Sequence, residues 1–168
     1  MSEGRPPAQA IVRRGRRSDF AASETGVSFD IEPWDAERRE TWFEAFASRG
    51  RYQLVVAEEA AEVVGFACTS QWKAKAAYDT TAEATIYLRP GVLGRGIGRA
   101  LYGALFAGLA GADLRAIVAV VALPNEASLA LHRSFDFVSV GVFPEVGHKF
   151  GRYHDVEWFR RPWSGPAL

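Results

Sequence analysis

Four glycines crowd the junction between two apolar segments, and this junction constrains the fold more than any other part of the sequence. Residues 89–102 read RPGVLGRGIGRALY, between a strand-like run at 83–88 and a helix-like run at 100–110. Glycine lets the backbone approach a ligand, and a helix start directs free N–H groups and a positive dipole end at that ligand. We therefore expect a cradle for phosphate or pyrophosphate, flanked by three arginines suited to an anion: Arg89, Arg95 and Arg99.

Two common phosphate-binding fingerprints do not fit this loop. A P-loop needs Lys and then Ser or Thr after the last glycine, but Gly98 is followed by Arg99 and Ala100. The dinucleotide fingerprint needs a third glycine where this chain has Arg99 or Leu101, depending on the glycine that starts the count. Taken alone, the loop is equally consistent with a plain strand-to-helix turn.

The composition indicates one globular domain with a hydrophobic core. The 168 residues are 48% hydrophobic and carry zero formal net charge, which favours neither nucleic acid nor a membrane surface as a partner. The one cysteine, Cys68, excludes an internal disulfide framework and is expected to be buried in a reducing compartment. No run is long and apolar enough to span a bilayer, and no hydrophobic segment follows the N-terminal arginines, so we expect a cytoplasmic protein. One cysteine and three scattered histidines predict no metal site.

Local patterns predict alternating helices and strands after an N-terminal tail. Residues 1–24 are rich in arginine and lack periodicity, so we expect a flexible tail before a domain at 25–168. Helices are predicted at 35–50, begun by Asp35 and ended by Gly50, at 97–109, and at 126–134, where Ser128 is expected to cap or support the first turn. A short turn or helix is expected at 73–78, and strands at 52–58, 63–72, 82–88, 114–123, 137–144 and 153–159.

Several motifs around the glycine loop resemble the GNAT acetyltransferase superfamily. They are VLGRGIGRALY, a strand ending in LPN, and SLALHRSFDF. The segments WKAKAAYDTTAE, VAVVALPNEASLALH and GHKFGRYHDV are similar to its phosphinothricin and methionine sulfoximine N-acetyltransferase branch. The resemblance spans residues 25–163. It implies a single-domain α/β fold with a central mixed, mostly antiparallel sheet flanked by helices, acetyl-CoA as co-substrate, and a homodimer.

Acetyl transfer to an amine needs a base, because the ammonium must lose a proton before it attacks. Glu83 stands between Ala82 and Ala84 in a predicted strand, and buried carboxylates are rare unless they are used or paired. The resemblance implies that Glu83 is the catalytic glutamate. It also places His132 where much of the superfamily has a tyrosine, to act as an acid or to pair with Glu83. A solvent-facing carboxylate and a core or surface histidine are the alternatives.

The resemblance assigns the remaining site residues in two groups. Acetyl-CoA would bind the backbone of one strand, the glycine loop and a later helix start: Ile86, Tyr87, Leu88, Gly94, Arg95, Gly96, Ile97, Gly98, Arg99, Asn125 and Ser128. Core packing is the alternative for Tyr87, and helix capping is the alternative for Asn125 and Ser128. The acceptor would meet a lysine-aromatic cluster, which suits an anionic head, and the late strands: Trp72, Lys73, Tyr78, Lys149 and His154. For the cluster, loop packing with a solvated lysine is the alternative.

The predicted reaction is N-acetylation of a small L-amino acid analogue of the phosphinothricin, methionine sulfoximine or methionine sulfone type. The amine would attack the thioester directly, without an acyl-enzyme. Three departures from the family pattern are Leu93 in place of Gln or Arg, Phe135-Asp136-Phe137 in place of Leu-Gly-aromatic, and no strand-and-helix pattern in residues 1–24. Another amine acceptor therefore remains an alternative, as does a non-catalytic acetyl-CoA-binding module.

Overall fold

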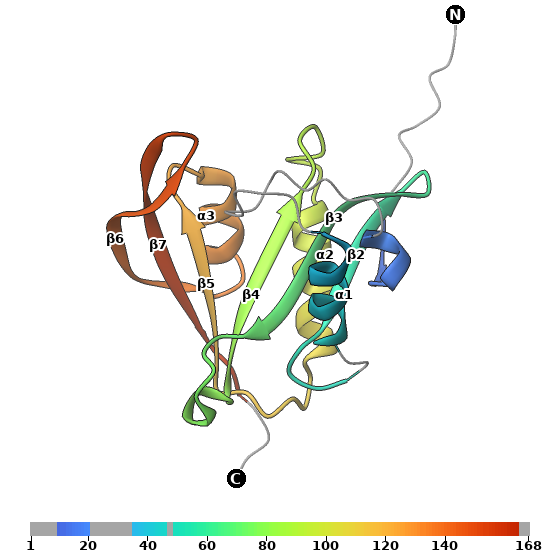
Figure 1. Ribbon diagram of the computed structural model, residues 1–168, viewed down its shortest axis with the longest axis horizontal. Helices are drawn as coiled ribbons and strands as arrows, with labels where there is room; N and C mark the ends of the chain where they lie inside the picture. Colours follow the sequence, from blue (N-terminus) through green and yellow to red (C-terminus); the bar gives the residue numbers. More distant parts are fainter. Residues whose placement is uncertain (1–9, 21–34, 47–48, 165–168) are drawn as a thin grey trace, which may run out of the picture.

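A twisted mixed sheet forms the centre of the molecule (Figure 1). The computed structural model describes residues 10–20, 35–46 and 49–164. Within these residues seven strands lie in the order β1-β2-β3-β4-β5-β7-β6, and only the β4–β5 pair is parallel. The prediction of a mixed, mostly antiparallel sheet is confirmed. The strands are β1 (Ile11–Arg14), β2 (Leu54–Glu59), β3 (Glu62–Gln71), β4 (Thr81–Leu88), β5 (Ala116–Ala122), β6 (Val138–Lys149) and β7 (Arg152–Pro162).

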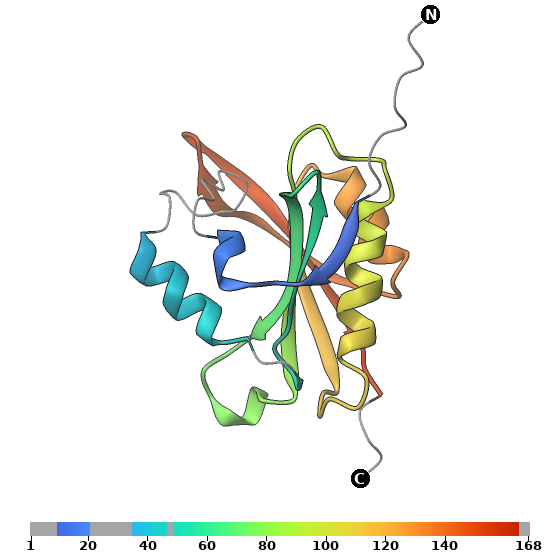
Figure 2. The ribbon, with the colours of Figure 1, turned by 90° about the vertical axis from the view of Figure 1, so that its right-hand side faces the viewer.

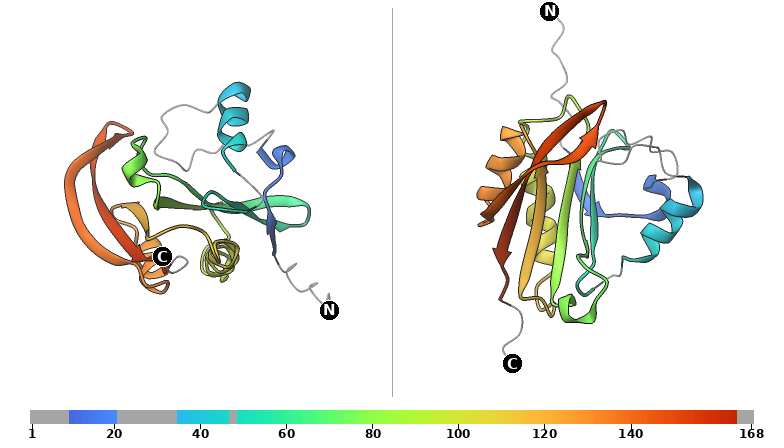
Figure 3. Two further views of the ribbon diagram at one scale, coloured as in Figure 1. Left: turned by 90° about the horizontal axis from the view of Figure 1, so that it is seen from below. Right: turned by 60° about the vertical axis from the view of Figure 1, so that its left-hand side comes forward.

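Helices cover both faces of the sheet (Figures 2 and 3). On one face lie α2 (Ile97–Gly108) and α3 (Glu126–Arg133), and on the other lies α1 (Ala36–Glu44). The buried stripe of α2 includes Leu101, Tyr102 and Leu105, and it packs on the main core. On the opposite face, α1 contributes aromatic side chains to a smaller cluster with Leu54, Val56 and Cys68.

The expected flexible tail is wrong for residues 11–20. The strand β1 pairs antiparallel with β2 at the sheet edge, and a short 3-10 helix, η1 (Arg17–Phe20), follows it. Arg13 holds the two together, since its guanidinium lies 2.7 Å from Asp19 and 2.5 Å from Glu58. The arginine-rich composition predicted a flexible tail, but one of these arginines, Arg13, forms partly buried ion pairs. Residues 1–9 and 21–24 lie outside the described residues.

Most helix starts agree with the sequence, but two details need correction. Asp35 caps α1, accepting a hydrogen bond from the Arg38 amide at 2.8 Å, but the helix ends at Glu44 instead of Gly50. The amides of Ala45 and Phe46 bond to carbonyls three residues back, which tightens the last turn. At α3 the capping side chain is Asn125, which accepts from the Ser128 amide at 3.1 Å, so Ser128 is not the cap.

The prediction of a long loop between the last two strands, at residues 145–152, is wrong. Strand β6 runs on to Lys149 and β7 starts at Arg152, so only Phe150 and Gly151 form the turn. Both turn residues have left-handed φ angles, 53° and 73°, as a two-residue hairpin requires. The register shifts twice along β6, near residues 139–141 and 143–147, and these bulges break the alternation that reveals a strand in a sequence.

Candidate active site

The two parallel strands at the centre of the sheet separate, and this separation makes the site. Strands β4 and β5 pair at three positions that end with Glu83 and Val118, although both strands continue beyond this point (Figure 1). A cavity of about 440 Å³ opens there, between β4, β5, α3 and the β6–β7 hairpin. Its lining residues are Glu83, Ala84, Thr85, Ile86, Tyr87, Val120, Ser128, His132, Val146, Gly147, Val156 and Trp158.

Glu83 lies where the strands part and lines this cavity. It pairs with Ser70 of β3 on one side and Val118 of β5 on the other, and it is only partly exposed. Burial raises the pKa of the Glu83 carboxyl above its ordinary value of 4.5, and the nearby ammonium of Lys73 opposes part of that rise. A carboxylate with a raised pKa is a better proton acceptor for an ammonium group than an exposed one.

His132 lines the same cavity, but its ring is held by other groups. Its side chain is 2% exposed, its Nδ1 lies 2.8 Å from the Ser128 carbonyl oxygen, and its Nε2 lies 2.8 Å from the Tyr102 hydroxyl. A carbonyl only accepts, so Nδ1 carries the proton and Nε2 accepts from Tyr102. Burial lowers the pKa of the ring, which keeps it neutral. No hydrogen bond joins His132 to Glu83 among the described residues.

Tyr102 is the residue that sequence reasoning missed. It is fully buried on α2, and burial raises the pKa of its phenol. A buried tyrosine hydroxyl usually has a hydrogen-bond partner, so the apolar helix pattern around Tyr102 hinted that a partner exists. Nothing local pointed to His132, which lies 30 positions further along the chain.

The glycine loop has the open surface that a pyrophosphate group requires. Gly91, Gly94 and Gly96 have φ angles of 89°, 75° and 79°, and a Cβ atom added at any of them would meet nothing within 4 Å. Gly96 is the N-cap of α2, so the free amides of the helix start face this open space. Gly98 serves packing instead, because a Cβ there would lie 3.1 Å from the side chain of Leu131.

The three arginines beside the loop have different partners. Arg95 forms a two-pronged ion pair with Glu59, at 2.6 and 3.1 Å. Arg89 pairs with Glu62 at 2.8 Å. The guanidinium of Arg99 lies over the ring of Phe135, 5.8 Å from its centroid.

The residues expected along the arm of acetyl-CoA lie on the free part of β4 and at the start of α3. Ile86 and Tyr87 line the cavity, beyond the last pair with β5. The ring of Tyr87 also packs on Phe66, with centroids 5.4 Å apart, so its core-packing alternative is present as well. Asn125 caps α3, and Ser128 lines the cavity.

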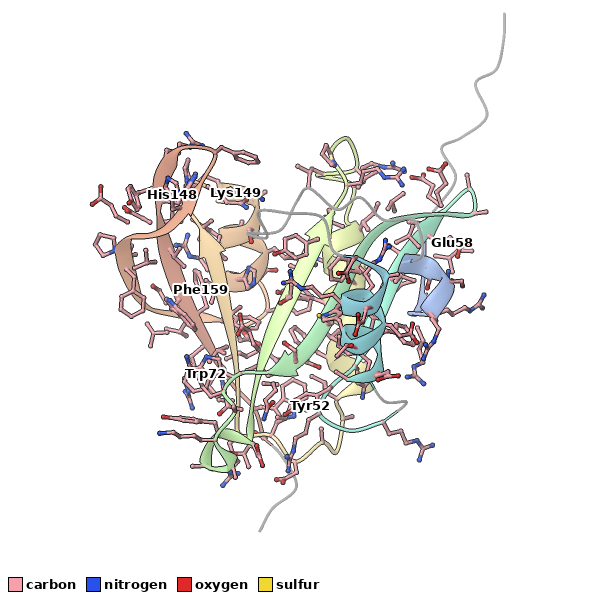
Figure 4. All side chains as sticks on the ribbon, in the orientation of Figure 1. Tyr52, Glu58, Trp72, His148, Lys149 and Phe159 are labelled. Atoms are coloured by element: carbon pink, nitrogen blue, oxygen red, sulfur yellow. The ribbon has the colours of Figure 1, made fainter. Side chains whose placement is uncertain are left out.

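The expected acceptor residues fall into two separate places (Figure 4). The rings of Trp72 and Tyr78 meet edge to face at 5.1 Å, and Lys73 lies over Trp72 and close enough to influence Glu83. The buried indole N–H of Trp72 has no hydrogen-bond partner among the described residues. Lys149 lies at the other end of the β6–β7 hairpin, away from Trp72, whereas His154 pairs with the cavity residue Gly147.

The described residues contain neither a cluster of metal ligands nor a membrane-spanning helix. No group of three or more His, Cys, Asp or Glu side chains is placed to hold a metal ion. None of the helices in this part of the chain is both long and apolar enough to cross a membrane.

Comparisons with known proteins agree with this geometry. Residues 17–137 match the model of the acetyltransferase (GNAT) family. A phosphinothricin N-acetyltransferase of Streptomyces coelicolor is 48% identical over 141 residues, covering 83% of this chain and 82% of that protein. An L-methionine sulfoximine/L-methionine sulfone acetyltransferase of Pseudomonas paraeruginosa is 34% identical, covering 83% and 81%.

A solved structure extends the likeness to the acetyl donor. A GNAT superfamily phosphinothricin acetyltransferase from Sinorhizobium meliloti, in complex with acetyl-CoA, has a TM-score of 0.80 and 29% identity, covering 95% of this chain and 91% of that one. With a family match over most of the sequence and a relative that is 48% identical over 141 residues, this chain belongs to the GNAT family of acetyltransferases, whose co-substrate is acetyl-CoA.

Proposed function

We propose that this chain acetylates the amine of a small L-amino acid analogue of the phosphinothricin, methionine sulfoximine or methionine sulfone type. The observation that carries this proposal is the position of Glu83, a partly buried carboxylate with a raised pKa at the point where β4 and β5 separate. The names of the relatives from Streptomyces coelicolor and Pseudomonas paraeruginosa support this acceptor class.

In the proposed mechanism, Glu83 takes a proton from the acceptor ammonium. The amine nitrogen then attacks the thioester carbonyl carbon directly, so a C–N bond forms, the C–S bond breaks, and no acyl-enzyme is made. Coenzyme A leaves as a thiolate and takes up the second proton, which the nitrogen loses as the amide forms. Acetyl-CoA, when bound, supplies the activated acetyl group. We propose that the backbone amides of β4 that lie beyond Glu83 and face away from β3 orient and polarise the carbonyl, since β5 does not pair with them. Cys68 is buried in the core cluster on the α1 face with its pKa raised to about 12, which argues against a thiol nucleophile.

The lysine-aromatic cluster supports an anionic acceptor. Lys73 supplies a positive charge near Glu83, and the buried indole N–H of Trp72 supplies a hydrogen-bond donor that no described residue uses. An acceptor with a carboxylate and an oxidised or anionic head satisfies both groups. We place Trp72, Lys73 and Tyr78 in the acceptor site, with His154 beside the cavity and Lys149 at the β6–β7 turn.

The hydrogen bonds of His132 support a positioning role more than direct proton exchange with Glu83. Both ring nitrogens are engaged within the protein, and the neutral ring fixes α3 as one wall of the cavity. Ser128, one turn earlier on α3, then presents its side chain to the same space.

Calorimetry with acetyl-CoA, followed by a free-thiol release assay over a panel of amines, tests the proposed function. We expect acetyl-CoA to bind and thiol release to be fastest with phosphinothricin, methionine sulfoximine or methionine sulfone. Faster release with a polyamine or an aminoglycoside would replace the proposed acceptor. Binding without release on any amine would indicate a non-catalytic module, and no binding would overturn the proposal as a whole.

We further propose a homodimer that works in the cytoplasm. The sheet ends at β6, and this edge strand exposes apolar side chains, each 46–66% accessible: Val138, Val140, Val142 and Phe143. Such an edge is prone to association, and a second copy of the chain would cover it. The free thiol of Cys68 and the use of acetyl-CoA support a reducing, intracellular compartment. Light scattering on the purified protein, with Val142→Lys as a disrupting variant, tests the dimer.

A further inference from the structure

The turn between β2 and β3 is tied to the glycine loop by two ion pairs. Both segments lie at the same end of the sheet (Figures 1 and 2). The Glu59 carboxylate accepts two hydrogen bonds from the Arg95 guanidinium in a bidentate ion pair, at 2.6 and 3.1 Å. Glu62 accepts from Arg89 at 2.8 Å, and the same guanidinium donates to the Val63 carbonyl at 3.0 Å. The side chains that bridge the two segments are thus two glutamates from the turn and two arginines from the loop.

The turn is a two-residue hairpin between paired strands, whereas the loop is rich in flexible glycine. Ala60 and Ala61 both adopt left-handed φ angles, 51° and 65°, in a two-residue hairpin turn. A Cβ atom added at any of the three open glycines would meet nothing within 4 Å, and glycine has the most conformational freedom to lose. Val92 anchors the middle of the loop in the core. The arginine pairs therefore hold the two sides of the loop around this anchor.

The carboxylates of Glu59 and Glu62 are unexpected beside a loop that receives phosphates. Two carboxylates next to an anion-binding loop would by themselves repel a pyrophosphate. Here both are paired, and Arg95 lowers the pKa of Glu59 through its hydrogen bonds, so Glu59 stays ionised and bound to Arg95. The net charge of each pair is zero, which leaves the amides at the start of α2 and Arg99 to attract the ligand.

We propose that Glu59 and Glu62 are positioning residues for acetyl-CoA: through Arg95 and Arg89 they keep the glycine loop in the conformation that receives the pyrophosphate. The inference rests on this loop being the pyrophosphate site. If the two glutamates acted on the pyrophosphate only through their negative charge, removing one of them should tighten the binding of acetyl-CoA, which is the opposite prediction. The sign of the change in affinity therefore separates the two explanations.

The decisive variant is Glu59→Gln, which keeps the size of the side chain and removes its charge. We expect the Kd of acetyl-CoA, measured by calorimetry, to rise about three- to fivefold, the effect expected for one exposed two-pronged ion pair. The loss should appear in KM for acetyl-CoA rather than in kcat. Arg95→Ala should weaken binding similarly, and the double variant should be little worse than either single variant. Glu44→Gln, at an exposed position on α1, is the matched control.

Amide hydrogen exchange of the free protein gives a second readout, which does not need the ligand. We expect faster exchange at the amides of Val92 and Ala100, which bond to the carbonyls of Arg89 and Gly96, in Glu59→Gln than in the wild type or Glu44→Gln. Tighter binding in Glu59→Gln with weaker binding in Arg95→Ala would mean that Arg95 meets the phosphates directly, and would overturn the inference. Unchanged affinity and exchange would also overturn it. If the wild type fails to bind acetyl-CoA, the proposed function fails, and the exchange rates still test the support of the loop.

Discussion

The hydroxyl of Tyr102 lies 2.8 Å from Nε2 of His132, and this bond joins α2 to α3 inside the core. The rings of Phe137 and Phe159 pack against the imidazole, with centroids 5.2 and 5.6 Å away. The Ser128 carbonyl binds the other ring nitrogen, so the orientation and tautomer of the ring are both fixed. His132, which lines the cavity, is thus held by Tyr102 of α2, the helix that starts at the glycine loop.

Tyr102→Phe removes one hydroxyl and leaves the buried Nε2 of His132 without its donor. We expect the free energy of unfolding to fall by about 1–3 kcal/mol, the cost of an unsatisfied buried polar group. Urea denaturation measures this loss. Phe106→Leu, on the same face of α2, is a control for packing loss without a hydrogen-bond change. A Tyr102→Phe variant as stable as the wild type would mean that this bond contributes nothing.

The buried imidazole should also make stability depend on pH. Burial lowers the pKa of His132 in the folded state below its ordinary value of 6.5, so the unfolded chain binds the proton more readily. Its contribution to stability is therefore complete above pH 6.5 and is lost as the pH falls toward the folded pKa. One proton gives a slope of at most about 1.4 kcal/mol per pH unit. Urea denaturation between pH 5 and 7.5 should show that the free energy of unfolding rises with pH. This slope should be smaller in His132→Gln and unchanged in His148→Gln, because His148 is exposed.

Local patterns predicted the parts of the fold that short-range physics controls. The start of α2 at Ile97 and the path of β4 follow from the glycine loop and from strand alternation, and both were predicted closely. The catalytic candidates Glu83 and His132 came from motifs, and the structure places both on one cavity. Long-range partners were not predictable in the same way. Tyr102 and His132, or Glu59 and Arg95, meet only because the chain folds back over 30 and 36 positions.

The errors of prediction have specific causes. Strand β1 was missed because its arginine-rich sequence lacks the apolar alternation that marks a half-buried strand. The end of β6 was missed because two bulges shift the register of its partner. The predicted anion-binding arginines were chosen by proximity in sequence, and only the fold could reveal that two of them are bound to glutamates.

Arg13 should be important for stability although it lies in an arginine-rich segment. Its guanidinium bonds to Asp19 and Glu58, whose side chains are 7% and 30% accessible, so its removal takes the ion-pair partner from a nearly buried carboxylate. We expect Arg13→Ala to cost about 1–3 kcal/mol. Arg16→Ala is the control, because the Arg16 side chain is exposed and only its backbone amide bonds to Asp19. Equal losses in the two variants, measured by urea denaturation, would contradict a special role for Arg13.

Glu83→Gln tests the proposed general base. Replacing the carboxylate by an amide of the same size removes the proton acceptor, so kcat should fall by a factor of about 10² to 10⁴ at neutral pH. The Kd of acetyl-CoA should change little, because the proposed contacts of the acetyl donor are with the backbone and the glycine loop. The free-thiol assay and calorimetry measure the two quantities. A kcat close to the wild-type value would remove Glu83 from the mechanism.

Lys73→Met should move the pH dependence of the reaction in a defined direction. The ammonium of Lys73 opposes the rise that burial causes in the pKa of Glu83, so its removal should raise that pKa further. The base is active when ionised, and the acidic limb of the kcat/KM profile should therefore shift to higher pH. Lys75→Met, which removes an exposed lysine two positions away, should leave the limb in place. A shift to lower pH, or equal shifts in both variants, would contradict the placement of Lys73 beside the base.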